Sequence, residues 1–543
     1  MPAISFCRLV NRSIKTNAGF LVAVCYFANP SLSASSMSDL ELNDPNYSAL
    51  CEHVRETGYL ESTAALLEWD QQTKMPALAS DYRSEQITHF AGLIHQRKID
   101  PRVGEWLEHL ADSPLAADPA SDSGATIRIL KREYEKRIKL PATLVMELAR
   151  AASVGQTQWV EARRENDFKG FAPQLKKIFE LKKSEAEAIG YAEVPYDALL
   201  DEYEPGARTS EVAGILEALR QELVPLVAQI KGSSYRAPVD ILNRNFPIDQ
   251  QRLLGRTASE AIGFDYRKGR LDVTHHPFCT EMGPKDCRIT TRYDENFFSG
   301  SLFGTLHEAG HGIYEQGLRS EYYSLPPGKY CSLGIHESQS RLWENLVGRR
   351  LSFWQYLYPQ AQGLFQEALG DVSLGEFYHA INHVEPSLIR VEADEATYNL
   401  HIIIRFELEQ AIINGELDTD DLPDAWNEKY LRYLGIQASE DANGVLQDVH
   451  WSAGLVGYFP TYSLGNLYAS QIFDAANAQL GDLDTMFQAG DFVPLKNWLN
   501  EKVHKVGQCL SGPQLGVQVT GIELSHEALM CHLREKLIPI YGL

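Results

Sequence analysis

The segment His307-Glu-Ala-Gly-His311 carries the side chains with the clearest chemical potential in this sequence of 543 residues. Two histidines at positions i and i+4 of a helix lie on nearly the same face, so both imidazoles can reach one metal ion. Glu308 follows the first histidine and is placed to take a proton from a water molecule at that ion. The segment therefore predicts a metal-assisted active site, and two solvated histidines on an ordinary helix are the plainer alternative.

A catalytic zinc ion usually has three protein ligands and one open position, so a third ligand is required. Glu337, within Gly334-Ile-His-Glu-Ser-Gln-Ser-Arg341, is the preferred candidate, and its neighbour His336 is the alternative. A turn rich in proline and glycine at 324–329 precedes this segment. The segment is therefore expected to form the next helix after the one that carries the two histidines.

A second histidine pair, His379 and His383, repeats the same spacing. Residue 380 is alanine, so no general base stands beside the pair. We interpret these histidines as structural or solvated, and not as a second metal site.

The elements that must position these residues are predicted to be mainly helical. Apolar residues recur at three- and four-residue spacing with charges between them, which is the period of an amphipathic helix. This pattern runs through residues 125–150, 172–190, 211–224, 364–369 and 397–414. Two segments just before the histidine helix, 270–278 and 287–293, are rich in β-branched and aromatic residues and predict a small hairpin or two short strands.

Composition excludes several classes of function. Hydrophobic residues make up 44% and charged residues 23%, as in globular domains, and the formal net charge of −23 disfavours binding to nucleic acid or to an anionic membrane. The sequence contains no apolar run long enough to cross a membrane. Its eight cysteines form no Cys-x-x-Cys pair, so neither a disulfide framework nor a thiolate zinc cage is expected. Reducing, cytoplasmic conditions fit best.

Residues 1–38 differ from the rest of the chain, because they contain basic residues but no acidic residue before Asp39. A basic start followed by an apolar run resembles a secretory signal or an organelle transit peptide. We favour the alternative that translation starts at Met37, with 1–36 as an upstream artefact. If residues 1–36 are a true leader, the protein is secreted or organellar. Residues 39–543 are predicted to be a single catalytic domain.

Six segments in order resemble the carboxypeptidase Taq family of zinc metallocarboxypeptidases, and Leu67–Pro76 resembles the opening segment of that family. The six segments are His276–Phe278, Asp286–Thr290, His307–His311, His336–Gln339, Ile389–Asp394 and Gly444–Trp451. Together these matches run from about residue 59 to residue 465. Six motifs in the right order make the resemblance specific.

The resemblance implies a single-metal exopeptidase that removes one residue at a time from peptide C-termini with broad specificity. His307, His311 and Glu337 would bind one Zn²⁺ per chain, with Co²⁺ as a substitute, and Glu308 would be the general base. The resemblance therefore favours Glu337 over His336 as the third metal ligand. The resemblance also implies a single large, mainly α fold with a deep substrate cleft, a small sheet beside the metal, and a homodimer.

An exopeptidase must recognise the free α-carboxylate of its peptide substrate, and arginine suits this task because its guanidinium is a bidentate fork. Arg390 is predicted to be the carboxylate clamp, and Arg288 a second contact or a support of the cleft. Either arginine is alternatively an ion-pair partner of acidic residues nearby in the sequence. His450 is predicted to stabilise the developing oxyanion or bind substrate backbone, with a packing role as the alternative, and Tyr458 and Tyr462 are weaker candidates for the same donor.

Two other functions compete with this prediction. A helical zinc endo-oligopeptidase would cut peptides internally and would need no carboxylate clamp. An inactive peptide-binding scaffold would keep the fold without the chemistry, and it is disfavoured because none of the motif residues is missing. The expected partners are peptides with a free C-terminal carboxylate and a second copy of the chain.

Overall fold

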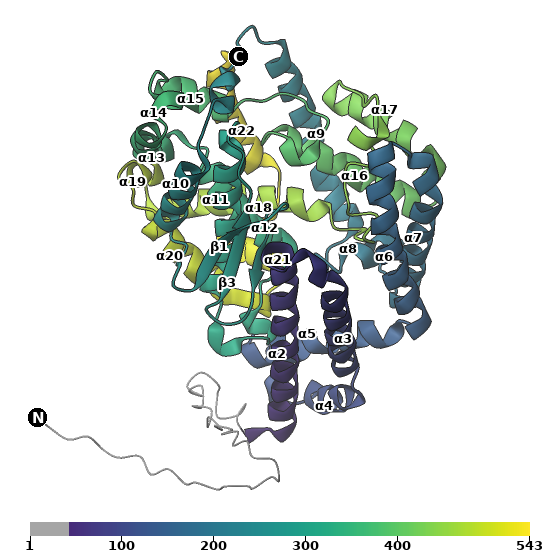
Figure 1. The fold of residues 1–543 in the computed structure, drawn as a ribbon. Coiled ribbons are helices and arrows are strands. Elements are labelled where there is room, and N and C mark those ends of the chain that lie inside the picture. Colours follow the sequence, from purple (N-terminus) through teal and green to yellow (C-terminus); the bar gives the residue numbers. More distant parts are fainter. Residues whose placement is uncertain (1–42) are drawn as a thin grey trace, which may run out of the picture. The chain divides into compact units, whose positions relative to one another are not determined.

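The computed structural model describes residues 43–543, which belong to one unit that spans Asp39–Leu543. The leader and the alternative start at Met37 lie outside the described residues. The structure is 70% helical with one small three-stranded sheet, which confirms the predicted mainly α fold (Figure 1). No helix in the described part is both long and apolar enough to cross a membrane.

The helices follow one another along the chain, with longer connections between α10 and α11, where the sheet lies, and between α17 and α18. They are α2 (Pro45–Thr73), α3 (Ser80–Lys98), α4 (Pro101–Ala111), α5 (Asp122–Lys139), α6 (Ala142–Glu165), α7 (Phe168–Ile189), α8 (Pro195–Leu200), α9 (Thr209–Gly232), α10 (Ile248–Ile262), α11 (Phe298–Gly317), α12 (Leu333–Arg341), α13 (Leu351–Leu364), α14 (Gln366–Leu369), α15 (Leu374–Ile381), α16 (Thr397–Ile413), α17 (Leu422–Leu434), α18 (Pro460–Leu480), α19 (Leu483–Gln488), α20 (Val493–Lys502), α21 (Gly512–Thr520) and α22 (Glu527–Tyr541). A π-helical segment, Leu342–Val347, directly follows α12.

The amphipathic segments predicted from the sequence form helices, with two differences. The segment 364–369 spans the end of α13 and the whole of α14, with Phe365 between the two helices. Residues 125–150 are divided between α5 and α6, because α5 ends at Lys139 and α6 begins at Ala142. Pro141 stands at this break, and the residue before a proline is biased away from helical backbone. One continuous helical pattern in the sequence is therefore two helices in the fold.

The sheet consists of β1 (Gly269–Val273), β2 (Cys279–Glu281) and β3 (Cys287–Thr291) in the order β1-β3-β2. Strands β1 and β3 are the two predicted segments, but they pair in parallel and do not form a hairpin with each other. The hairpin is made by β2 and β3, which pair antiparallel. The edge strand β2 is not anticipated by the sequence pattern, because three residues are too few to show a period of two.

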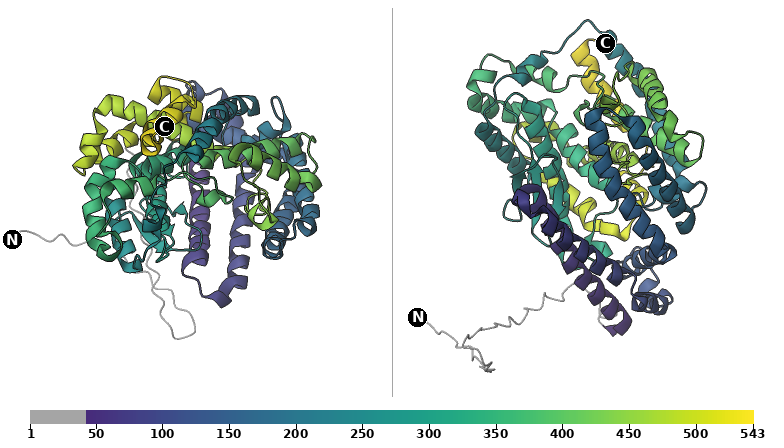
Figure 2. Two further views of the ribbon diagram at one scale, coloured as in Figure 1. Left: turned by 90° about the horizontal axis from the view of Figure 1, so that it is seen from above. Right: turned by 45° about the vertical axis from the view of Figure 1, so that its right-hand side comes forward.

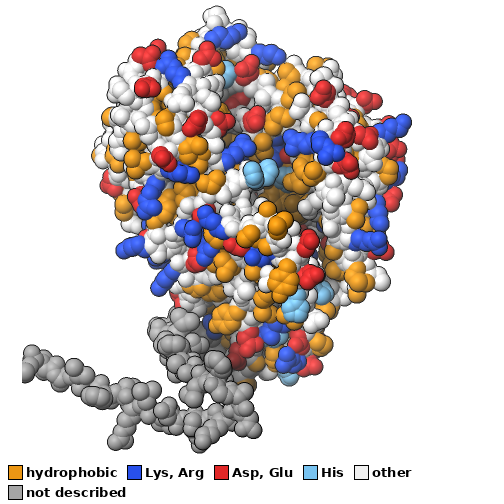
Figure 3. All heavy atoms as spheres, in the orientation of Figure 1, with side chains coloured by type: hydrophobic (Ala, Val, Ile, Leu, Met, Phe, Trp, Pro, Cys, Tyr) orange, Lys and Arg blue, Asp and Glu red, His pale blue; other side chains and the backbone are white. Residues whose placement is uncertain are grey.

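Helices α11, α12 and α18 lie together in the interior. Helix α11 packs on α10, α12 and β3, and α12 packs on α18. Large side chains such as Trp343, Trp354 and Phe298 are fully buried beside them. Helices α6 and α7 pack side by side on the right of Figure 1, and α2 packs against α3, as the turned views in Figure 2 also show. On the face drawn in Figure 3, acidic and basic side chains are interspersed and the surface is hollowed near its centre.

Candidate metal centre and substrate cavity

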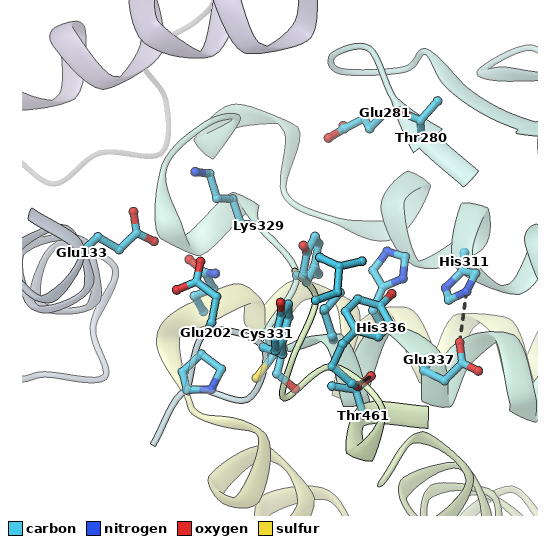
Figure 4. Close-up of a pocket in the computed structure, with 18 of the residues that line it drawn as sticks. Glu133, Glu202, Thr280, Glu281, His311, Lys329, Cys331, His336, Glu337 and Thr461 are labelled. Carbon is cyan, nitrogen blue, oxygen red and sulfur yellow. Dashed lines mark hydrogen bonds and ion pairs between the residues drawn. The ribbon is translucent and has the colours of Figure 1, made fainter. Parts of the chain in front are cut away.

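The side chains of His307, His311 and Glu337 meet between α11 and α12. Their ligand atoms all lie within 4.8 Å of one another. Glu337 Oε2 is 3.3 Å from His311 Nε2 and 3.7 Å from His307 Nε2, and Figure 4 shows His311 and Glu337 facing each other. No other group of three such ligands occurs in residues 43–543. Two imidazole nitrogens and one carboxylate oxygen fit a catalytic zinc ion with an open position.

The close approach of three helices at this centre depends on two glycines. A Cβ at Gly310 of α11 would lie 2.6 Å from the carbonyl oxygen of Gln339 in α12. A Cβ at Gly465 of α18 would lie 2.5 Å from Cγ of Glu337. Helix α12 is therefore held between two glycine-bearing faces, which fixes where Glu337 points. The packing role of Gly465 is not predicted from the sequence. The only indication there is a glycine inside a helical pattern.

We expect Gly465→Ala to displace the Glu337 side chain, because the added methyl group has no room. Overpacking of this kind costs about 1–3 kcal/mol of folding free energy, and the displaced carboxylate should also bind metal less tightly. Urea denaturation and metal titration of the purified variant measure the two effects. Gly214→Ala in α9, where nothing lies within 4 Å of an added Cβ, is the matched control. Equal stability and metal affinity in the two variants would contradict the packing argument.

Buried charges set the ionisation of the ligands. Although burial alone would raise it, Arg341 and the two imidazoles hold the pKa of Glu337 well below its usual range. Burial lowers the pKa of His311 to about 3, so its ring is neutral at physiological pH. A carboxylate and a neutral imidazole are the protonation states in which these side chains bind a metal.

Glu308 lies beside the ligands and lines the same cavity as they do. Its side chain is buried, with 6% relative exposure, and burial raises its pKa to about 7. A carboxyl group with a pKa near neutrality can both accept and return a proton, which is what a general base that later acts as an acid must do.

A cavity of about 1170 Å³ opens onto this centre. Its wall is formed by residues of α2, α5, α7, β2, α11, α12 and the start of α18 together with the loops around 201–205, 323–333 and 454–458. In Figure 4, Glu133, Glu202 and Lys329 lie toward one end of the cavity, and His311 and Glu337 lie toward the other. A large cavity lined by both polar and apolar side chains, with the metal centre toward one end, has room for an extended peptide.

Arg390, the predicted carboxylate clamp, does not line this cavity. It is 5% exposed, and its Nε and Nη2 donate to Asp448 Oδ1 at 2.9 Å and 2.7 Å. The second oxygen of Asp448 accepts from Nε of the fully buried Arg405 at 2.7 Å. This placement favours the ion-pair alternative for Arg390. The partner lies 58 residues away, so the nearby acidic residues considered from the sequence are not its partners.

Arg288 also lies outside the cavity wall. Its guanidinium pairs with Asp286 at 2.8 Å and lies 4.4 Å from the ring centroid of Trp69. The contact with Trp69, in the family-like segment 67–76, joins α2 to the sheet. Arg288 therefore supports the cleft, which is one of the two roles predicted for it. Its ion pair with Asp286 also agrees with the alternative that it is the partner of a nearby acidic residue.

His450 lies behind the cavity wall, with Nε2 3.2 Å from the hydroxyl of Tyr462. Tyr462 and Tyr458 themselves line the cavity. Burial raises the pKa of Tyr458 to about 12, so its hydroxyl keeps its proton at neutral pH and can donate a hydrogen bond. The two tyrosines, which are the weaker candidates in the sequence, are better placed than His450 to contact a substrate.

The other histidines considered in the sequence, His336 and the pair His379 and His383, have partners of their own, and His383 Nε2 lies 3.2 Å from Glu385. His336 Nε2 is 2.7 Å from Glu315, and its ring stacks on His311 with centroids 4.5 Å apart. His336 therefore packs against the ligand His311 and is not itself one of the grouped metal ligands. His379 Nδ1 is 2.6 Å from the hydroxyl of Tyr235, which agrees with a structural role.

The helical fold and a centre of two histidines and one carboxylate beside a long cavity define a helical metallohydrolase. A model of the carboxypeptidase Taq (M32) metallopeptidase family matches residues 49–537, so the chain belongs to this family of metallocarboxypeptidases.

Curated relatives and solved structures agree with this assignment. Thermostable carboxypeptidase 1 of Thermus thermophilus is 47% identical over 506 residues, which cover 91% of this chain and 99% of the relative. Carboxypeptidase 1 of Bacillus subtilis is 38% identical over 90% of this chain and 97% of its own length. The crystal structure of an M32 carboxypeptidase from Deinococcus radiodurans superposes with a TM-score of 0.89 at 38% identity, covering 92% of this chain and all of that one.

Proposed function

We propose that this chain is a zinc-dependent carboxypeptidase of broad specificity that releases residues one at a time from the C-termini of peptides, with Glu308 as general base. The observation that carries the proposal is the convergence of His307, His311 and Glu337 beside the buried Glu308 in one long cavity. Two imidazoles and a carboxylate suit zinc, and Co²⁺ accepts the same donor set.

A zinc ion, when bound, supplies Lewis-acid activation of water and of the scissile carbonyl. Glu308 accepts the proton released as water attacks and later delivers it to the leaving amine. Tyr458 and Tyr462 line the same cavity, and their hydroxyls are the proposed hydrogen-bond donors to the carbonyl oxygen as it gains negative charge. His450 holds Tyr462 from behind, and Arg390, whose guanidinium lies 5.2 Å from the Tyr462 ring centroid, supports the same side chain.

The direction of cleavage is tested with a peptide series carrying either a free or an amidated C-terminus. We expect one-residue ladders from the free peptides, a strong loss of rate on amidation, and no cleavage after chelation. Mass spectrometry of timed digests reads all three. Equal cleavage of the free and amidated peptides would indicate the alternative, an endo-oligopeptidase. A homodimer and a cytoplasmic location stay predictions.

A further inference from the structure

Two charged side chains that are not ligands contact the metal ligands from behind. Glu344 Oε2 is 2.9 Å from His307 Nδ1, and Arg341 Nε donates to Glu337 Oε1 at 2.7 Å. Arg341 Nη1 also donates to Glu344 Oε2 at 3.3 Å, so the two supporting side chains are joined. The side chains of Arg341 and Glu344 are each only 13% exposed. Water therefore competes little for these contacts.

The contact with Glu344 fixes which nitrogen of His307 faces the ion. A carboxylate only accepts hydrogen bonds, so His307 Nδ1 must carry the proton. The lone pair of Nε2 then points at Glu337 and the centre, as a ligand requires. A carboxylate behind a ligating imidazole also makes that imidazole a stronger base.

The contact with Arg341 selects one oxygen of Glu337. Oε1 is engaged by the guanidinium, while Oε2 faces both ligating imidazoles and also accepts a hydrogen bond from Ser340 Oγ at 3.1 Å. Glu337 is therefore set up to offer a single oxygen, which leaves more of the coordination sphere open for water and substrate. Arg341 is itself fixed by the ring of Tyr398, whose centroid lies 4.3 Å from the guanidinium carbon.

Local helix geometry brings the two supports to the centre. Glu337 and Arg341 are one turn apart at the end of α12, and Glu344 follows in the π-helical segment Leu342–Val347. Short π-helical segments occur frequently at functional sites. Only one of the two histidine ligands has such a support. His311 Nδ1 is buried, and no residue of the described part hydrogen-bonds to it.

We propose that Glu344 and Arg341 are positioning residues that set the geometry of the metal ligands, Glu344 through the protonation and orientation of His307 and Arg341 by restricting Glu337 to one oxygen. The proposal rests on the proposed metal centre. It concerns binding of the ion before any substrate arrives, so it is testable without peptide cleavage.

Glu344→Gln tests the first support. Glutamine keeps the size of the side chain but removes the negative charge, and such changes behind a ligand lower metal affinity about 10- to 100-fold. Competition with a chromophoric chelator measures the dissociation constants for Zn²⁺ and Co²⁺. The control is Asp484→Asn, which weakens the Arg350–Asp484 ion pair of α13 and α19 and touches no ligand. An affinity of Glu344→Gln equal to that of the control would overturn the role of Glu344.

Arg341→Lys tests the second support. Lysine keeps the positive charge but lacks the planar fork, so Glu337 is freed to bind with both oxygens. We expect the visible absorption of bound Co²⁺ to weaken, as it does when the coordination number rises above four. A spectrum identical to that of the wild type would overturn the role of Arg341.

Unfolding of the metal-free proteins separates positioning from folding. If either substitution only destabilised the fold, the folded fraction would keep the affinity and spectrum of the wild type, which contradicts the proposal. A wild-type protein that binds neither Zn²⁺ nor Co²⁺ would instead overturn the proposed metal centre on which the inference rests.

Discussion

Replacing Glu308 by glutamine is expected to lower kcat by about 10²- to 10⁴-fold, the usual contribution of a positioned general base. Glutamine preserves the shape of this buried side chain but accepts no proton. Because Glu308 is not among the grouped ligands, metal content should stay that of the wild type. Initial rates on a peptide with a free C-terminus, together with metal analysis of the same sample, measure both quantities.

Two outcomes would contradict this role for Glu308. Unchanged turnover would exclude Glu308 as the base, and loss of the ion along with activity would show that Glu308 acts through the metal centre. Glu108→Gln is a matched control, because it makes the same substitution at an exposed position of α4 and should leave turnover unaltered.

Replacing Asp448 by alanine is expected to lower the free energy of unfolding by about 3–5 kcal/mol, the usual cost of breaking a buried ion pair. The carboxylate serves two buried arginines, Arg390 and Arg405, and its removal leaves both charges uncompensated. Urea denaturation followed by circular dichroism measures the change. The exposed pair Lys176–Asp418 gives the control, since Lys176→Ala removes this pair and should cost no more than about 1 kcal/mol.

The same network separates the two interpretations of Arg390. If Arg390 is a structural partner of Asp448, Arg390→Met lowers stability and affects free and amidated peptides alike. If Arg390 clamps the substrate, the variant raises KM for peptides with a free carboxylate and leaves amidated peptides unaffected. The burial of the guanidinium and its bonds to Asp448 favour the first result.

The two histidine ligands are predictable from the sequence because their spacing follows from helix geometry, whereas the choice of Glu337 over His336 rests on the family resemblance. His307 and His311 share one helix face, and Glu337 stands on the next helix, so a turn between two helices is enough to bring them together. The mainly helical fold is predictable for the same reason, since the amphipathic period is a local property.

The rest of the site depends on contacts between distant segments, which no local pattern reports. The pairing of Arg390 with Asp448 spans 58 residues, and the contact of Gly465 with Glu337 joins α18 to α12. The parallel pairing of β1 with β3 depends on a third strand of only three residues. Each of these features is decided by tertiary packing, so motif and period alone do not determine it.

The cavity wall draws residues from Glu61 near one end of the described chain to Gln508 near the other. No short fragment of the protein therefore contains the whole site, so the active centre depends on nearly the whole folded unit. Changes of specificity in such a molecule are expected to come from substitutions within this one unit. Gain or exchange of a whole domain is not expected to change the specificity of this site.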